Sequence, residues 1–233
     1  IKVIFIPDKH KIYKTSFTVY FKNKNLNTMR KIVYLYGIGV DNGTITTDQE
    51  TNSICGILRK TNAPYYLDGE FYVNTQYSRY DSLVIEPGVE IFFSAQSNLS
   101  IKGLLIAEGK EDEKIVISAA DTTKGWRGIE FVRNNYGRKH SIIRECIIKY
   151  SFDSGIKCIN GAAPLIERSL IYKNQTTGCL SDGAGGGIRC HDGSSPIIRE
   201  NEIINNFTEY EQGGGIFIGD DCNPVIENNI ISN

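Results

Sequence analysis

The stretch that decides the fold lies near the C-terminus, where PIIRENEII at residues 196–204 returns as PVIENNII at residues 224–231. Both phrases open with proline, and both keep isoleucine at matching positions on either side of an asparagine. Two further copies precede them, IIRECII at 142–148 and LIERSLI at 165–171. One phrase written four times with different fillings predicts a repeat protein rather than a low-complexity segment.

A Gly-Ile pair precedes each copy and sets the length of the repeat. The isoleucines of successive pairs are 27, 32 and 28 residues apart; they are Ile129, Ile156, Ile188 and Ile216. Short β-branched runs broken by Gly, Asn and Pro indicate strands and turns rather than helices. A unit of roughly 25 to 30 residues cannot bury its apolar face alone, so we expect the copies to stack as coils about 4.8 Å apart, with parallel strand pairing.

Stacking places equivalent residues of successive coils in columns. One inward column is expected to contain the isoleucines of the Gly-Ile pairs. The next inward column, two residues further on, is expected to contain Phe131, Cys158, Cys190 and Ile218. The asparagines of the repeated phrase, Asn201 and Asn229, are predicted to form a short amide ladder at a turn, where side-chain amides satisfy backbone groups.

The six cysteines show no spacing typical of a zinc site. Directly stacked Cβ atoms in parallel strands are about 4.8 Å apart, whereas a disulfide requires about 3.8 Å. We therefore predict that Cys158 and Cys190 are buried and reduced. Cys179 and Cys222 lie in turn-like insertions, and we predict that these two pair more readily, with each other or outside this chain.

Several phrases resemble right-handed parallel β-helix proteins of the kind that bacteria export. LVIEPGVEIFF (83–93), LSIKGLLIAEG (99–109) and GWRGIEF (125–131) resemble the first coils of such proteins, with Lys110 where threonine is usual. GGGI, SPIIRENEII and NPVIENNII resemble their later coils. The resemblance covers residues 65–233. It implies a right-handed parallel β-helix (β-solenoid). Together with an N-terminal antiparallel β segment, indicated by the residues described next, the expected fold class is all-β.

The N-terminal residues differ from the repeat. Residues 1–40 alternate apolar and polar side chains, as half-buried antiparallel strands do. Their ending, VYLYGIGV, resembles the last strand of immunoglobulin-like modules, so we interpret residues 1–40 as a partial module of that kind. The polar, turn-rich residues 41–64 are interpreted as a linker or cap. In the alternative, all of residues 1–64 cap the β-helix.

The last coil is expected to be open at its C-terminal end. VIENNIISN at 225–233 is no polar cap, and bare solenoid edges favour pairing with another chain. We therefore interpret the chain as a fragment or assembly unit of a larger chain, and we expect self-association through this coil.

The composition narrows the classes of partner. Hydrophobic residues make up 40% and charged residues 23% of the chain, as in an ordinary folded domain. A net charge of −1 argues against nucleic acid or an anionic membrane surface. No apolar run approaches the length of about 18 residues that crosses a bilayer. We expect no nucleic-acid partner and no membrane span in this chain.

Candidate ligand-binding residues lie just beyond the Gly-Ile strand, in a column that contains Arg133, Asn160, Asp192 and Asp220. Asp192 and Asp220 would lie one coil apart, at about 5 Å, within the range of a carboxylate pair that cleaves glycosides. Asp and Asn before Gly, Ser or Asn are also typical turn residues. We name Asp192, Asp220 and Asp221 as candidate contacts for a sugar or cation. We assign no catalytic residue, metal or cofactor.

Two other sets of side chains are candidate surfaces. The first is an outward column, expected to be a solvated face, that contains Glu130, Lys157, Arg189 and Phe217. The second is a set of tyrosines that suggests an aromatic platform but does not share one register: Tyr136, Tyr150, Tyr172 and Tyr210.

The β-helix fold serves polysaccharide lyases, glycoside hydrolases, adhesins and surface proteins, so it does not fix a function. We favour a non-catalytic extracellular or cell-surface protein with a structural or adhesive role, whose partner is carbohydrate or another surface protein. The alternative is a carbohydrate-active enzyme of the same fold, either a polysaccharide lyase or a glycoside hydrolase.

Overall fold

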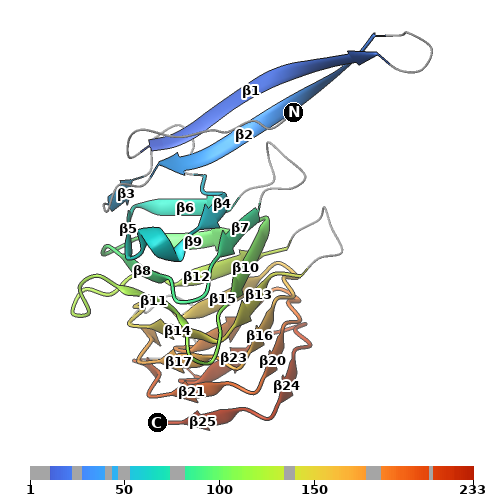
Figure 1. The fold of residues 1–233 in the computed structure, drawn as a ribbon. Helices are drawn as coiled ribbons and strands as arrows, with labels where there is room; N and C mark the ends of the chain where they lie inside the picture. Colours follow the sequence, from blue (N-terminus) through green and yellow to red (C-terminus); the bar gives the residue numbers. More distant parts are fainter. Residues whose placement is uncertain are drawn as a thin grey trace.

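The computed structural model describes residues 11–22, 28–39, 44–46, 53–73, 82–133, 140–176, 185–209 and 212–233, with side chains from residue 53 onward. Strands dominate these residues, and their only helix is one short 3-10 helix, Lys60–Asn62. Three parallel sheets run along one stack of coils, from β4 at one end to β24 at the other (Figure 1). The predicted all-β solenoid is therefore confirmed.

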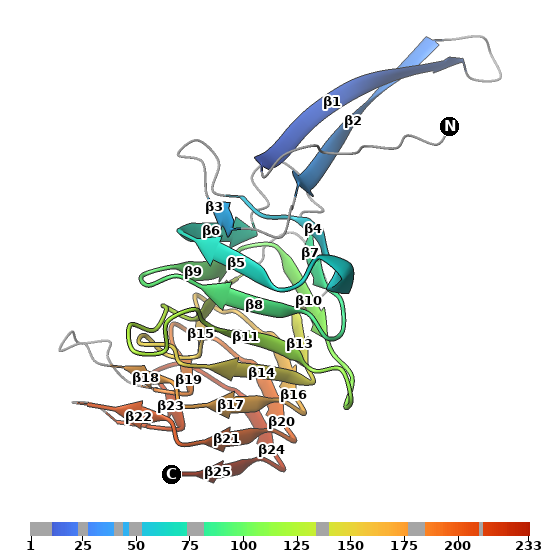
Figure 2. The ribbon, with the colours of Figure 1, turned by 60° about the vertical axis from the view of Figure 1, so that its left-hand side comes forward.

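The chain visits the three sheets in a fixed order, and we call them sheets I, II and III (Figure 2). Sheet I contains β4 (Gly56–Leu58), β7 (Ser82–Ile85), β10 (Leu104–Glu108), β13 (Ile142–Arg144), β16 (Leu165–Glu167), β20 (Ile197–Arg199) and β24 (Val225–Glu227). Sheet II contains β3 (Thr44–Thr46), β5 (Tyr65–Asp68), β8 (Glu90–Phe93), β11 (Ile115–Ala119), β14 (Cys146–Lys149), β17 (Leu170–Tyr172), β21 (Glu202–Ile204) and β25 (Ile230–Ser232). Sheet III contains β6 (Glu70–Val73), β9 (Asn98–Ile101), β12 (Ile129–Val132), β15 (Ile156–Ile159), β19 (Ile188–Cys190) and β23 (Ile216–Ile218). A short pair, β18 (Gln175–Thr176) and β22 (Phe207–Thr208), follows sheet II in two coils.

The register of sheet III confirms the predicted inward column of isoleucines. Ile129 pairs with Ile156, Ile156 with Ile188, and Ile188 with Ile216. The first three are fully buried, and Ile216 packs against the core from the last coil. Because side chains alternate between the two faces of a strand, one correct position fixes the inward face of every coil.

The neighbouring inward column confirms that Cys158 and Cys190 are buried and reduced. They are register partners, fully buried, and both thiols are free. The contact with Cys190 and the burial of the thiol raise the pKa of Cys158 well above its ordinary value. Because the thiolate is the reactive form, this thiol is a core side chain rather than a nucleophile. Cys222 is also a free thiol, and Cys179 lies outside the described residues, so the pairing expected for these two is not observed.

From β13 onward, the corners of the coils are turned by residues in the left-handed backbone region, with φ between 45° and 60°. Such bends repeat in successive coils, so each corner carries a column of side chains. The corner between sheets I and II contains Glu145, Arg168, Glu200 and Asn228. The corner between sheets II and III contains Tyr150, Lys173 and Asn205. The corner between sheets III and I contains Asn160, Asp192 and Asp221.

Buried asparagine ladders support the bends. As predicted, Asn229 Oδ1 accepts hydrogen bonds from the backbone N–H and from Nδ2 of Asn201, both at 2.9 Å. Asn201 Oδ1 in turn accepts from the Ser169 N–H at 3.0 Å. The sequence did not predict a second ladder, in which Asn206 Oδ1 accepts from the N–H and Nδ2 of Asn174 at 3.0 and 3.1 Å. These amides satisfy backbone donors that the bends remove from the sheets.

The second ladder explains the glycine of the repeated Gly-Ile pair. A Cβ atom on Gly155 would lie 2.8 Å from Asn174 Nδ2. A Cβ atom on Gly187 would lie 2.5 Å from the carbonyl oxygen of Gly215 and 3.1 Å from Asn206 Cγ. Any larger residue at these positions would therefore displace the ladder.

A column of alternating charges runs along sheet I. Its members are register partners in successive strands: Glu108, Arg144, Glu167, Arg199 and Glu227. The Glu167 side chain is 1% exposed and accepts hydrogen bonds from both neighbouring arginines, with Arg199 at 2.7 Å. Burial alone would raise the pKa of Glu167, but the hydrogen bonds and charges of Arg199 and Arg144 outweigh it, so the pKa of Glu167 lies below its ordinary value.

The N-terminal strands form a separate antiparallel pair. β1 (Lys11–Lys22) and β2 (Thr28–Gly39) pair from Lys11 opposite Gly39 to Lys22 opposite Thr28, next to the first coil (Figure 1). This pair is the expected antiparallel segment, while its immunoglobulin-like identity stays a prediction. Within residues 41–64, β3 and β4 already pair in parallel with β5 and β7. Strands of the solenoid sheets therefore occur inside the segment interpreted as a linker or cap.

The opposite end of the stack exposes core-type side chains on edge strands. Ile226 and Ile231 are 38% and 51% exposed, although they are the register partners of Ile198 and Ile203, which are fully buried. That the β-helix is open at this end stays a prediction.

Candidate functional site

The corner between sheets II and III brings together two tyrosines and two lysines, which we call the tyrosine–lysine patch: Lys149, Tyr150, Tyr172 and Lys173. Lys149 ends β14 and is the register partner of Tyr172, which ends β17. Tyr150 and Lys173 follow in the left-handed bends of these two coils. Because the order is Lys-Tyr in one coil and Tyr-Lys in the next, like residues face each other diagonally.

The two tyrosine rings form an edge-to-face pair, and the ammonium group of a lysine lies over each ring. The ring centroids of Tyr150 and Tyr172 are 6.5 Å apart, with an angle of 66° between the planes. Lys149 Nζ lies 5.6 Å from the Tyr150 centroid, and Lys173 Nζ lies 5.0 Å from the Tyr172 centroid. Both distances are in the range of a cation–π contact. Hydrogen bonding to the Tyr172 hydroxyl raises the pKa of Lys173, so its ammonium group stays charged at neutral pH.

The patch is positively charged and is anchored to the core through Tyr150. Tyr150 is half-buried and packs against the core, and its backbone N–H donates to the Lys173 carbonyl oxygen at 3.2 Å. Within the described residues, neither Lys149 nor Lys173 forms an ion pair with a carboxylate. A fixed aromatic surface beside two ammonium groups can bind the C–H face of a sugar ring together with an acidic substituent.

Sequence reasoning named these tyrosines but did not bring them together. Tyr150 and Tyr172 occupy different register positions, as expected, yet the diagonal across two coils places their rings in contact. The signal that would have found the contact is the inverted order of KY at 149–150 and YK at 172–173. Tyr136 and Tyr210 lie outside the described residues.

The structure places Asp192 at an exposed turn of the corner between sheets III and I. The turn is closed by the Ser194 N–H, which donates to the His191 carbonyl oxygen at 3.1 Å. Asp192 and Gly193 adopt φ values of 52° and 70°. Aspartate is one of the residue types that tolerate the left-handed region, so Asp192 acts as a turn residue here, as its sequence context indicated.

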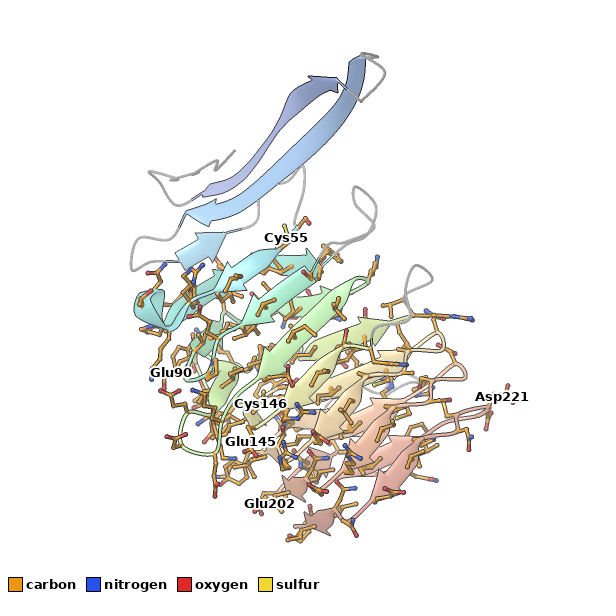
Figure 3. All side chains as sticks on the ribbon, turned by 45° about the vertical axis from the view of Figure 1, so that its right-hand side comes forward. Cys55, Glu90, Glu145, Cys146, Glu202 and Asp221 are labelled. Atoms are coloured by element: carbon orange, nitrogen blue, oxygen red, sulfur yellow. The ribbon has the colours of Figure 1, made fainter. Side chains whose placement is uncertain are left out.

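Asp220 and Asp221 occupy the corresponding turn of the next coil, and both are exposed. Figure 3 shows Asp221 at the outer edge of the stack, pointing away from the coils. The two turns are held together by the Gly219 N–H, which donates to the Cys190 carbonyl oxygen at 2.8 Å. A ligand-binding role for Asp192, Asp220 and Asp221 stays a prediction.

The outward column expected to be a solvated face differs at Lys157. Its side chain is only 10% exposed, with Nζ 3.0 Å from Asp153 Oδ2 and 3.8 Å from Glu130 Oε2. The expectation was wrong here because Asp153, from the preceding bend, covers the ammonium group. Lys157 also pairs with Glu130, its neighbour in the column.

Two general features complete the description of the site. Within the described residues, His, Cys, Asp and Glu side chains form no group of three or more that could hold a metal ion. In the same part of the chain, no helix has the length and apolar character needed to cross a membrane.

A comparison with known families finds a match. Residues 91–233, more than half of the chain, match the sequence profile described as the right handed beta helix region. No curated protein and no solved structure matches this chain.

Proposed function

The chain belongs to the right-handed β-helix family, and on that basis we propose that it is a non-catalytic structural part of an extracellular or cell-surface protein that binds acidic carbohydrate. The tyrosine–lysine patch carries this proposal. The two rings in contact offer apolar surface for the C–H face of a sugar, and their hydroxyl groups can bond its polar edge.

The two lysines select for an acidic ligand. Each ammonium group rests on a tyrosine ring and not on a carboxylate of the described residues, so its charge is available to a ligand. A carboxylate or sulfate on the sugar would form a charge-assisted hydrogen bond, which is stronger than a neutral one. Salt should weaken such binding, because the patch lies at the surface.

The structural role rests on the supports of the stack. The asparagine ladders and the charge column of sheet I join successive coils at many points. A stack held together in this way is a rigid carrier that presents corner residues at a fixed spacing of about 4.8 Å per coil.

Titration calorimetry with oligogalacturonate, and with a neutral oligosaccharide of the same length, tests the proposal. We expect the acidic ligand to bind, and the Tyr172→Ala substitution to weaken binding about tenfold or more, as the loss of a ring contact and its cation site predicts. Tyr66→Ala is the matched control, because Tyr66 is an exposed tyrosine of sheet II, 41% exposed and stacked on Phe92 away from the patch.

The control should bind within about twofold of the unchanged protein, and both variants should melt within a few degrees of it. Equal binding by all three proteins, or no binding of any acidic oligosaccharide, would contradict the proposal.

The enzyme alternative is tested with the same ligands. We expect no release of smaller sugars after long incubation. Release that is abolished by Asp192→Asn combined with Asp220→Asn would assign the chain to the carbohydrate-active enzymes instead, with those carboxylates as the pair.

A further inference from the structure

A small cavity opens at the corner between sheets III and I, apart from the tyrosine–lysine patch. Its volume is about 160 Å³, which is room for a small molecule rather than a single water. The end of β12 and the start of β16 flank the cavity. Its polar lining is Arg133, His140 and Ser141, and its apolar lining includes Ile101, Phe131 and Val132. Among the described residues that line it, none is acidic.

Arg133 differs from most other arginines of the described structure. Five others have a carboxylate within ion-pair distance: Arg59, Arg127, Arg144, Arg168 and Arg199. Arg133 has no such partner among the described residues. Its side chain passes over Gly161 of the next coil, where a Cβ atom would lie 3.3 Å from Arg133 Cδ. The missing side chain at Gly161 therefore makes room for the arginine at the cavity.

His140 and Ser141 have defined hydrogen-bonding roles. His140 Nδ1 lies 2.8 Å from the Ala163 carbonyl oxygen, which can only accept, so Nδ1 carries a proton. The second nitrogen, Nε2, is left for a ligand. Ser141 Oγ accepts a hydrogen bond from the buried Leu105 N–H at 3.0 Å. Its own O–H group therefore remains available to donate to a ligand.

We propose that this cavity binds a short carboxylate with an apolar body, held by Arg133 and assisted by His140 and Ser141. A guanidinium group pairs with a carboxylate through two parallel hydrogen bonds, next to the apolar wall of the cavity. The wall also offers surface to an alkyl chain, so affinity rises from acetate to propionate to butyrate. The site is independent of the carbohydrate proposal, because its residues lie at a different corner.

The test is a titration of the ¹⁵N-labelled chain with butyrate, butyramide and inorganic phosphate, followed through the backbone amides of Gly161 and Ala162. We expect saturable shifts with butyrate, none with the neutral isostere butyramide, and weaker binding of phosphate. Arg133→Gln should weaken butyrate binding about tenfold or more. Arg127→Gln is the matched control, because Arg127 is 48% exposed and already paired with Asp153.

The control and the Tyr172→Ala variant should bind butyrate within about twofold of the unchanged chain, which separates this site from the patch. No saturable shift with butyrate, or equal binding by Arg133→Gln, would overturn the site. Tighter binding of phosphate or of butyramide than of butyrate would overturn its assignment to carboxylates.

Discussion

Two corners of the stack are built by the same left-handed bend but differ in what their cations contact. Between sheets I and II, cations face carboxylates: Lys114 Nζ lies 2.6 Å from Glu145 Oε2, and Arg168 Nε lies 3.0 Å from Glu145 Oε1. Between sheets II and III, the cations Lys149 and Lys173 lie on tyrosine rings. The difference indicates which charges stabilise the fold and which are available to a ligand.

At the first of these corners, the charges are neutralised within the stack. Burial by itself would raise the pKa of Glu145, but Lys114 and Arg168 outweigh it and hold the pKa below its ordinary value. A carboxylate that is ionised and paired in this way joins neighbouring coils. At the second corner, no such neutralisation occurs within the described residues, so a bound acidic group would supply it.

The comparison requires that both corners belong to one stack of coils. The Ile188→Asp substitution should disrupt this stack. Ile188 is fully buried between Ile156 and Ile216, so an aspartate would bury an unpaired charge at a cost of several kcal/mol. We expect loss of cooperative melting by circular dichroism. Ile197→Asp, the same change at a side chain that is 41% exposed, should melt close to the unchanged chain. Similar melting of the two variants would show that the column is wrong.

The structural role of the paired charges is tested by Glu167→Gln. The change leaves Arg144 and Arg199 without their shared carboxylate, and we expect a loss of about 2 kcal/mol in the free energy of unfolding. This is less than for a fully buried pair, because both arginines reach water. Glu200→Gln is the control: its carboxylate is 48% exposed and 3.9 Å from Arg168, so the loss should stay below about 0.5 kcal/mol.

The pH dependence of stability is a second test of the Glu167 ion pairs. The pKa of Glu167 in the folded chain lies below its ordinary value of 4.5, so its stabilisation is complete above about pH 4.5 and is lost as the pH falls through the folded value. Denaturant unfolding of the unchanged chain should show this loss as the pH falls below about 4.5. The slope should be smaller in Glu167→Gln, since glutamine does not titrate. Identical slopes would mean that the carboxylate is not paired in solution.

The exposed isoleucines at the end of the stack predict self-association, the smallest of the effects expected here. Ile231 is 51% exposed on an edge strand, and we expect weak, concentration-dependent self-association of the chain in sedimentation velocity experiments. Ile231→Lys should reduce it, because a charge on an edge opposes strand pairing. Ile57→Lys is the control, as Ile57 is 49% exposed in the first coil. An unchanged sedimentation profile for Ile231→Lys would place any self-association elsewhere.

The sequence was sufficient for the stack and insufficient for the corner sites. The Gly-Ile pairs and the repeated asparagines fixed the register, because each position has one inward or ladder role in every coil. The ladder of Asn174 and Asn206 was missed although each lies five residues after a ladder position, at Ser169 and Asn201. It follows from the same repeat.

Contacts between different columns were harder to predict. Tyr150 and Tyr172 meet on a diagonal, so a search within one register could not pair them. Lys157 is covered by Asp153 from the preceding bend, whose course the strand pattern does not determine. The cavity beside Arg133 depends in the same way on how a bend closes over Gly161.

The most direct test of the difference between the corners is an oligogalacturonate titration of three proteins: the unchanged chain, Lys149→Gln combined with Lys173→Gln, and Arg168→Gln. Arg168 is 45% exposed and paired with Glu145, so it is an exposed cation at the other corner. We predict that the double lysine variant loses affinity about tenfold or more, while Arg168→Gln binds within about twofold of the unchanged chain. An equal loss in both variants, or a loss in Arg168→Gln alone, would contradict the account.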